Sequence, residues 1–183
     1  MRTVILGSLL IAASLYGDCQ YATQGVKVTW KAFKTYEKIG VGGTFDKTQL
    51  IAESASTVDA LLKGSSVSIQ TPSINSGNPG RDATLGNAFF KVQNVDSIHA
   101  TIQSAKDGKA LVDITMNGIT KTIPMNYVAS TNTVTGKGVI DLADFGMLGS
   151  LSSINKACYD LHAGKTWQDV EIGFEIQLNQ KCS

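Results

Sequence analysis

Apolar residues alternate with polar residues in short runs along this chain, and this period of two constrains the fold more than any other feature. Val26, Val28 and Trp30 alternate with lysine and threonine, and the stretch 170–178 repeats the pattern in the longest run. Because successive side chains of a strand point to opposite faces of a sheet, such runs predict strands with one buried face. The sequence therefore predicts an all-β fold.

Eight runs of this kind follow one another, at 26–31, 39–45, 67–69, 98–102, 110–116, 119–127, 134–142 and 170–178. Asn117-Gly118, between the fifth and sixth runs, is the strongest short hairpin signal. About eight strands close into a barrel just wide enough for one small ligand. Gly136 and Gly138 leave room on an inward face, where a glycine often marks a bend or the close approach of a ligand. We expect an antiparallel β-barrel of about eight strands with short helices in the connections.

Three connections break the alternation. Residues 56–64 read as a short helix that starts at a Ser or Thr cap and stops at a glycine. In 149–164, apolar residues lie at helical spacing, at positions 151, 154, 158 and 161. Residues 81–90 predict a short helix or turn. There we expect Asp82 to cap the helix, while Arg81 either binds nearby carbonyl groups or contacts a ligand's polar head at a pocket mouth.

The N-terminus has the composition of a targeting segment. Arg2 precedes an apolar run, 4–15, that is too short to span a bilayer, and Gly17 is a small residue at a plausible cleavage point. We expect residues 1–17 to be a cleaved signal peptide and 18–183 to be the mature domain. This predicts a periplasmic or secreted protein with no stable membrane insertion once the leader is removed.

Three cysteines allow one disulfide in the oxidising compartment that export implies. Cys19 and Cys182 lie just outside the first and last predicted strands. They come close together if these two strands pair antiparallel and close the barrel. We favour this pair and a free Cys158, although the sequence leaves all three pairings open. The cysteines show no metal-ligand spacing, and we expect no metal and no cofactor.

Charge and motif content argue against two functional classes. With 16 basic and 15 acidic residues, the chain has no basic excess of the kind that binds nucleic acid. His99 alternates with apolar neighbours, which predicts a surface position, and no nucleophile motif accompanies it. We therefore predict a protein that is not an enzyme. Two alternatives stay open: an enzyme that uses His99 or the Arg81–Asp82 pair, and a stress-response module that acts through protein partners.

Aromatic and methionine side chains at strand positions and strand ends are the candidate ligand contacts. For any one of them a packed core is the simpler interpretation, but together they suit an apolar cavity with an adaptable lining. With Arg81 added, the candidates are Trp30, Phe33, Phe45, Phe89, Phe90, Met116, Met125, Phe145, Met147 and Trp167.

Several stretches in a fixed order resemble the YceI-like family. The turn, Arg-Asp pair and double phenylalanine of "SINSGNPGRDATLGNAFF" are similar to the family's pattern after its third strand. "NGITKTIPM", "DLADFGM", "VTWKAFKTYEKIGVGGTF" and "VEIGFEIQL" resemble further family segments, so the likeness spans 26–178. One departure is Trp30 to Lys34, where many members carry an Asp-x-x-His-Ser segment, so any contact made by that histidine does not transfer. Residues 47–64 also look particular to a subgroup.

The resemblance implies a lipocalin-like antiparallel barrel with an elongated apolar tunnel, in a periplasmic or secreted protein that forms homodimers. Its ligand would be a long-chain amphiphile such as a polyisoprenoid, a fatty acid or a fatty amide. The function implied is non-enzymatic binding, transport or sequestration of that lipid.

Overall fold

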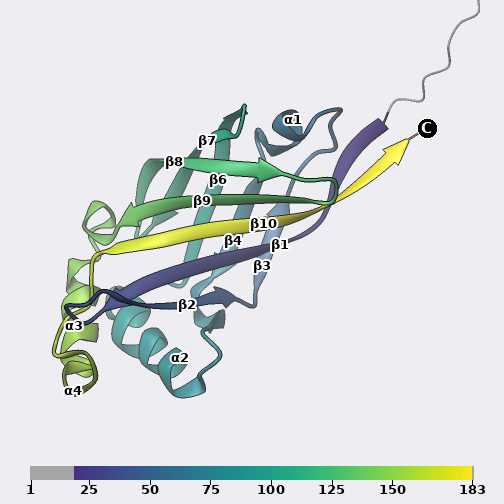
Figure 1. Ribbon diagram of the computed structural model, residues 1–183. Coiled ribbons are helices and arrows are strands. Elements are labelled where there is room, and N and C mark those ends of the chain that lie inside the picture. Colours follow the sequence, from purple (N-terminus) through teal and green to yellow (C-terminus); the bar gives the residue numbers. More distant parts are fainter. Residues whose placement is uncertain (1–18, 183) are drawn as a thin grey trace, which may run out of the picture.

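A computed structural model describes residues 19–182, which form one antiparallel sheet of ten strands that curls into a half-barrel (Figure 1). Along the sheet the order is β3-β4-β6-β7-β8-β9-β10-β1-β2-β5. The strands are β1 Cys19–Lys34, β2 Ile39–Phe45, β3 Thr48–Ile51, β4 Ser66–Gln70, β5 Ile74–Asn75, β6 Ser97–Lys106, β7 Lys109–Met116, β8 Ile119–Ala129, β9 Thr133–Asp141 and β10 Asp169–Cys182. The predicted class is confirmed, and the two strands beyond the expected eight are the short β3 and β5, whose few residues give no periodic signal.

Alternation along β7 shows why these residues form strands. Ala110, Val112, Ile114 and Met116 are at most 7% exposed, whereas Leu111, between them, is 46% exposed. Asn117 and Gly118 both have positive φ, as a tight two-residue hairpin requires. The strongest turn signal of the sequence therefore fixes the register of β7 against β8, and with it the face that is buried.

β3, one edge of the sheet, approaches β1 at residues 19–28, where β2 does not cover β1, and the described residues form no full backbone ladder there. Thr48 of β3 donates its hydroxyl to the carbonyl of Val26 in β1 at 3.3 Å. Farther along β1, Tyr21 and Ala55 form an isolated antiparallel bridge. The sheet is thus curled far enough to enclose an interior, although it is not a continuous cylinder.

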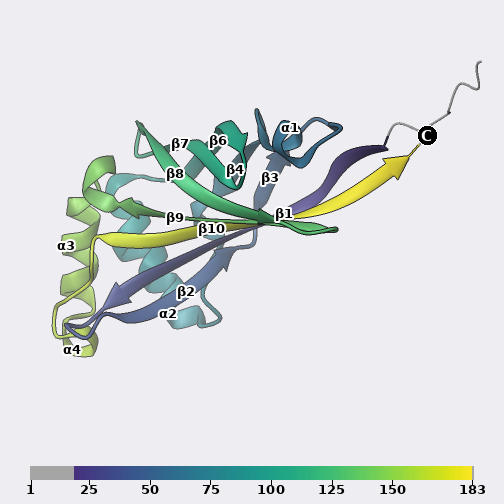
Figure 2. The same cartoon turned by 45° about the horizontal axis from the view of Figure 1, so that its top comes forward.

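β1 and β10 pair along most of their length and continue beyond the other strands as a two-stranded ribbon (Figure 2). Cys19 faces Cys182 at the ribbon's tip, and their sulfur atoms are bonded. This is the pair that the sequence favours, and Cys158 is free and buried. The proposed leader, residues 1–17, lies outside the described residues.

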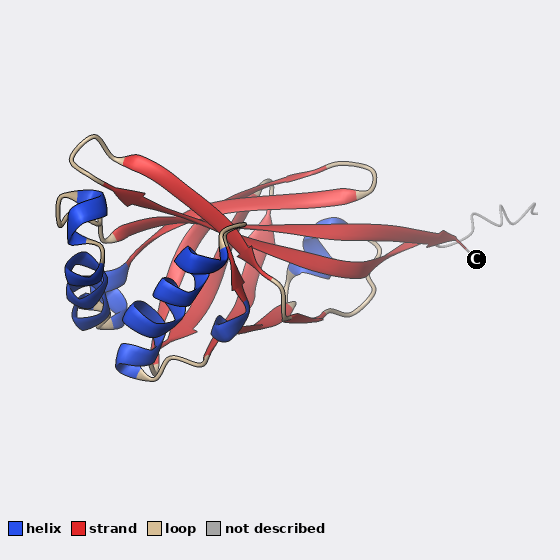
Figure 3. Ribbon diagram, turned by 90° about the horizontal axis from the view of Figure 1, so that it is seen from below, coloured by secondary structure: helices blue, strands red, loops and turns tan. Residues whose placement is uncertain are grey.

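Helices gather mainly at the opposite end from this ribbon (Figure 3). They are α1 Val58–Leu62, α2 Pro79–Leu85, α3 Leu148–Ala157 and α4 Tyr159–His162. The helix predicted in 56–64 is α1, which Thr57 caps by accepting the amide of Ala60. None of the helices in residues 19–182 has the length and apolarity needed to cross a membrane.

The segment predicted as one helix over 149–164 is two helices with a break at Cys158. Leu151, Ile154 and Cys158 are buried as their spacing predicts. Leu161 is 75% exposed, so its predicted place on the buried face is wrong. Cys158 has φ −113° and ψ 22°, outside the α-helical range, so the buried face of α3 does not continue to residue 161.

Candidate functional site

The interior of the half-barrel holds an apolar cavity of about 180 Å³. The wall comes from the inner face of the sheet and from the connections at the helical end. Among the described residues that line it, only Thr29 and Thr166 carry hydroxyl groups, and none is charged. A cavity with this lining favours an uncharged, chain-like occupant.

Seven of the eleven predicted ligand contacts line this cavity: Trp30, Phe45, Phe89, Phe90, Met116, Met125 and Trp167. They come from distant parts of the chain, on β1, β2, the π-helical turn Gly86–Phe90, β7, β8 and the connection that leads into β10. The sheet topology therefore brings together residues that the sequence identifies only by their type.

The other four predicted contacts lie elsewhere. Phe145 and Met147 are wholly buried in the core outside the cavity, because the 3₁₀ turn Leu142–Phe145 carries them away from β9 into the packing below α3. Phe33 is out of phase with Trp30 on β1, and the ammonium groups of Lys31 and Lys38 lie 5.0 and 5.2 Å from its ring centre. Phe33 and Arg81 line a second pocket beside the cavity.

Several cavity residues carry no distinguishing signal in the sequence, and Phe174 is the clearest example. Phe174 pairs with Gly136 across β9 and β10, and a Cβ added to Gly136 would lie 2.2 Å from the Phe174 ring. At Gly138 the space is taken by the Met125 side chain, 2.8 Å from an added Cβ. The room that these glycines leave is therefore filled by protein side chains, a correction to the expectation of space for a ligand.

Phe89 and Phe90 form one wall of the cavity together with Phe45. The Phe89 and Phe90 rings meet edge to face with centroids 5.0 Å apart, and the Phe45 and Phe90 centroids are 6.3 Å apart. Edge-to-face pairs at these distances are favourable. The double phenylalanine thus forms a packed aromatic wall where the connection from β5 crosses the half-barrel.

A second pocket of about 370 Å³, which we call the vestibule, adjoins the apolar cavity and has both apolar and polar groups in its wall. Both spaces share Trp30, Ala32, Leu85, Ile154 and Thr166 in their walls. The rest of the vestibule wall consists of Phe33, Lys34, Val41, Asn78, Gly80, Arg81, Thr84, Cys158, Leu161 and His162. It thus includes two cations and several neutral polar groups, and none of the described residues that line it is an aspartate or a glutamate. The vestibule thus lies beside the apolar cavity and has charged side chains in its wall, which the cavity lacks.

Two polar atoms in the vestibule wall are shielded from solvent and have no hydrogen-bond partner, Nδ1 of His162 and Oγ1 of Thr166. Burial lowers the pKa of His162, and the nearby Lys34 ammonium lowers it further, so the imidazole is neutral at pH 7. Buried polar groups are normally paired, so these two require an explanation.

Cys158 lines the same vestibule, but its environment keeps the thiol protonated. Burial raises the pKa of the Cys158 thiol, and the attraction of the Lys34 ammonium offsets this only in part. Because the thiolate is the reactive form, a raised pKa opposes a nucleophilic role.

The Arg81–Asp82 pair organises the loop that leads into α2. Arg81 donates from Nε to the hydroxyl of Ser76 at 2.8 Å and from a terminal nitrogen to the Ser76 carbonyl at 2.9 Å. Asp82 accepts the Ser76 amide at 2.8 Å and also the Ser76 hydroxyl. The helix cap is Asn78, which accepts the amide of Arg81 at 3.0 Å, so the expected N-cap role of Asp82 is wrong.

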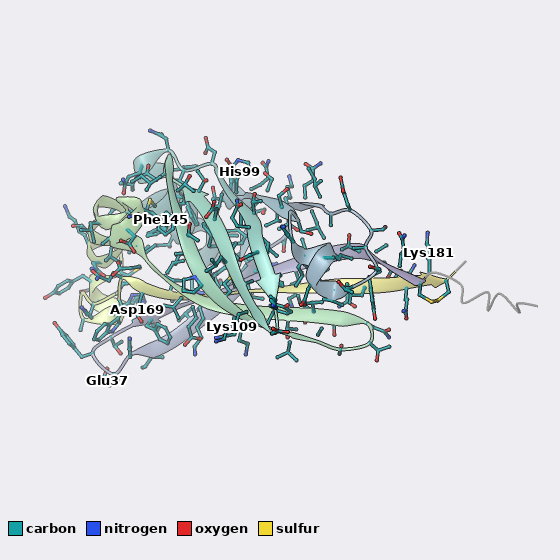
Figure 4. All side chains as sticks on the ribbon, turned by 90° about the horizontal axis from the view of Figure 1, so that it is seen from above. Glu37, His99, Lys109, Phe145, Asp169 and Lys181 are labelled. Carbon is teal, nitrogen blue, oxygen red and sulfur yellow. A yellow bond between two sulfur atoms is a disulfide. The ribbon has the colours of Figure 1, made fainter. Side chains whose placement is uncertain are left out.

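His99 lies on the outer face of β6, away from the cavity (Figure 4). Its Nε2 is 3.3 Å from the hydroxyl of Ser97, while Ile98 and Ala100, its neighbours in sequence, line the cavity. The predicted surface position is confirmed. Across residues 19–182, no cluster of three or more His, Cys, Asp or Glu side chains has a geometry that could hold a metal ion.

Comparison with known proteins agrees with this geometry. A family model described as the YceI-like domain matches residues 20–178. The fold is similar to a polyisoprenoid-binding domain from Saccharophagus degradans, at 12% identity, with a TM-score of 0.60 and coverage of 89% of this chain and 98% of that chain.

Two further solved structures share the fold. Burkholderia cenocepacia BcnA is 17% identical, with a TM-score of 0.57 over 84% of this chain and 96% of its own. A Campylobacter jejuni YCEI protein is 20% identical, with a TM-score of 0.53 over 78% and 85%. Among curated proteins, none matches the sequence closely enough to count as a relative.

Proposed function

The chain belongs to the YceI-like domain family, and from that premise we propose that it binds a long-chain amphiphilic lipid without transforming it. The observation that carries this proposal is the apolar cavity inside the half-barrel. The chain of the lipid would occupy the cavity, between the Phe45–Phe89–Phe90 wall and the strands opposite. One similar structure is described as a polyisoprenoid-binding domain, and this supports an isoprenoid or fatty chain as the ligand.

The energetics of the cavity fit such a ligand. Burying one methylene contributes about 0.8 kcal/mol, so two more carbons strengthen binding by roughly tenfold as long as the cavity has room. Affinity should therefore rise with chain length and level off once the chain fills the cavity.

The residues proposed for catalysis do not meet at this cavity, which supports a carrier rather than an enzyme. His99 is on the outer face of the sheet, and the Arg81–Asp82 pair is engaged by Ser76. A second candidate function, a stress-response module acting through partners, has no specific observation in its favour.

The proposal also includes export to the periplasm or the outside of the cell. The disulfide between Cys19 and Cys182 supports it, since such bonds persist in oxidising compartments. Homodimer formation is part of the proposal as well, and light scattering of the purified protein measures the molecular mass that tests it.

The direct experiment is mass spectrometry of lipid extracted from the protein after native purification, followed by titration of the emptied protein with alkyl chains of increasing length. Trp30 and Trp167 line the cavity, so their fluorescence reports binding. We expect a co-purified long-chain lipid and an affinity that levels off with length.

A matched pair of variants locates the binding. Ala100→Phe places a large side chain in the cavity wall, and Ala129→Phe makes the same change at an exposed position on β8. Only the first should abolish binding. If both variants bind as the wild type does, or if no chain of any length binds, the proposed function is wrong.

A further inference from the structure

The apolar cavity does not run the whole length of the half-barrel, because its lining stops partway along each strand on the side of the β1–β10 ribbon. On β8 and β10 the last lining residues are Met125 and Phe174. The next inward residues towards the ribbon, Tyr127 and Ile176, do not line the cavity. The lining of β1, β6 and β7 ends in the same way, at positions 28, 100 and 112. The cavity therefore has a closed end, which faces the ribbon.

The space beyond this closed end is filled by packed side chains, and α1 lies on the same side of the structure (Figure 1). Ile102, Tyr127 and Ile176 are at most 7% exposed and belong to the same hydrophobic core as Leu62 of α1. The amide of Gly64, which follows α1, donates to the carbonyl of Ile102 at 2.8 Å. A chain that fills the cavity therefore cannot extend past this layer without displacing the core.

Phe174 is the largest side chain at the closed end, and its position depends on a glycine in the neighbouring strand. It pairs with Gly136 of β9, and the nearest ring carbon lies 2.2 Å from the point that a Cβ of Gly136 would occupy. The ring therefore lies over the backbone of Gly136. Met125 lies over Gly138 in a similar way, with its Cγ 2.8 Å from an added Cβ. Two glycines thus make room for two bulky side chains where the cavity ends.

We propose that Phe174 determines the length of the lipid chain that this protein binds, and that Gly136 is the positioning residue that gives the Phe174 ring its place. The inference rests on the proposed function and names the residue that limits the chain. Phe174 lines the cavity whereas Ile176, the next inward residue of β10, does not, so the ring is the last surface on that strand that a chain meets. Carbons beyond this stop gain no further burial and add nothing to affinity.

The experiment measures affinity as a function of chain length with straight-chain 1-alkanols, from octanol through decanol to longer even-numbered chains. Each alcohol is titrated into the emptied protein, and the fluorescence of Trp30 and Trp167 reports binding. The chain at which the wild-type affinity levels off is the one that fills the cavity. Two further carbons should change the wild-type affinity by less than about twofold, because they find no apolar surface to cover.

Phe174→Ala removes the proposed stop, and the apolar space that a truncated side chain leaves can admit an apolar ligand. We expect the same two further carbons to strengthen binding to Phe174→Ala roughly tenfold. Ile176→Ala is the matched control, because it truncates a buried side chain on the same face of β10, two residues beyond the ring. Its affinity should level off at the wild-type length.

Gly136→Ala tests the inference in the opposite direction. The new Cβ would lie 2.2 Å from the Phe174 ring, so the ring must move, and the cavity is the open space beside it. The alkanol that just fills the wild-type cavity should bind Gly136→Ala roughly tenfold more weakly, as the loss of room for two carbons implies. This variant keeps every side chain of the cavity wall, so it decides the question if Phe174→Ala does not fold.

The outcomes distinguish a failure of this inference from a failure of the proposed function. If no alkanol binds the wild type, the proposed function itself is wrong. If alkanols bind but the affinity of Phe174→Ala levels off at the wild-type length, the cavity function stands and the role of Phe174 is overturned. The same holds if Ile176→Ala lengthens the preferred chain as much as Phe174→Ala does. Where only Gly136→Ala folds, an unchanged preferred length overturns the role of Phe174.

Discussion

Removing the disulfide between Cys19 and Cys182 should destabilise the protein by an amount that can be worked out from its topology. The two cysteines are 163 residues apart, so the bond closes a loop of nearly the whole mature chain. In the chain-entropy model, a loop of this size restricts the unfolded state by about 17 cal/mol/K, or about 5 kcal/mol at 25 °C.

The position of the bond lowers this expectation. It joins the tip of the β1–β10 ribbon, beyond the bridge between Tyr21 and Ala55, where few elements pack against the strands. Without the bond the tip can fray in the folded state and regain part of the entropy. We therefore expect a loss of about 3–5 kcal/mol, which corresponds to a fall in Tm of roughly 6–20 °C.

The assay is urea unfolding of the oxidised protein and of the Cys19→Ser/Cys182→Ser double variant, followed by the fluorescence of Trp30 and Trp167. Both proteins carry Cys158→Ala, so that thiol exchange cannot contribute. The slope of the transition should also rise, because an unfolded chain without the cross-link exposes more surface.

Ligand affinity is the control in this experiment, because the ribbon is distant from the cavity. Ligand affinity should be the same in both proteins, because the bond lies at the opposite end from the helices that border the cavity (Figure 2). A stability difference below about 1 kcal/mol would refute the loop-closure reasoning. A parallel loss of ligand affinity would show that the ribbon acts on the cavity, contrary to the arrangement described above.

Three further substitutions test other features. Gly136→Ala puts a Cβ 2.2 Å from the Phe174 ring. Overpacking of this kind should lower the free energy of unfolding, measured with urea or heat, by about 1–3 kcal/mol. An unchanged free energy of unfolding would mean that the ring moves aside freely. Burial and the hydrogen bond to Asp59 raise the pKa of Tyr127 to about 12. The neutral phenol therefore stabilises the folded state fully below pH 10, and this stability is lost as the pH rises through about 12. Tyr127→Phe should therefore lose less stability than the wild type between pH 10 and 12. Arg81→Ala should cost about 1.5–3 kcal/mol through the lost loop contacts, with decanol affinity unchanged; stable protein that no longer binds decanol would instead place Arg81 among the ligand contacts.

Much of the fold could be predicted because its signals are local. The alternation that buries Val112 and exposes Leu111, and the Asn117-Gly118 turn, act within a few residues and need no knowledge of the partner strands. The short strands β3 and β5 lack such signals, since their pairing depends on strands that are distant in the sequence. The sequence did not predict the break at Cys158, because its apolar residues keep helical spacing on both sides of the break, at positions 154, 158 and 161.

The site could be predicted only in part, for a similar reason. Residue type identified the aromatic lining, but the place of each side chain depends on register. Phe174 lies over Gly136 only because β10 pairs with β9 at that offset. Phe33 was predicted as a ligand contact because it is aromatic, but it is out of phase with Trp30 along β1 and does not line the cavity. The unpaired atoms of His162 and Thr166 exist only in the folded structure, and the sequence carries no sign of them.

The pairing of the first strand with the last also sets the order in which the protein can fold. β1 is synthesised first, but along most of its length one of its two neighbours is β10, which is synthesised last. Contacts between such distant segments form slowly, because a long loop must close before they contribute. Until that happens one edge of β1 is unpaired, and exposed edges are prone to aggregate. We expect refolding to be slow, with β1–β10 pairing as its last step. A chain truncated before β10 should aggregate even though it contains nine of the ten strands.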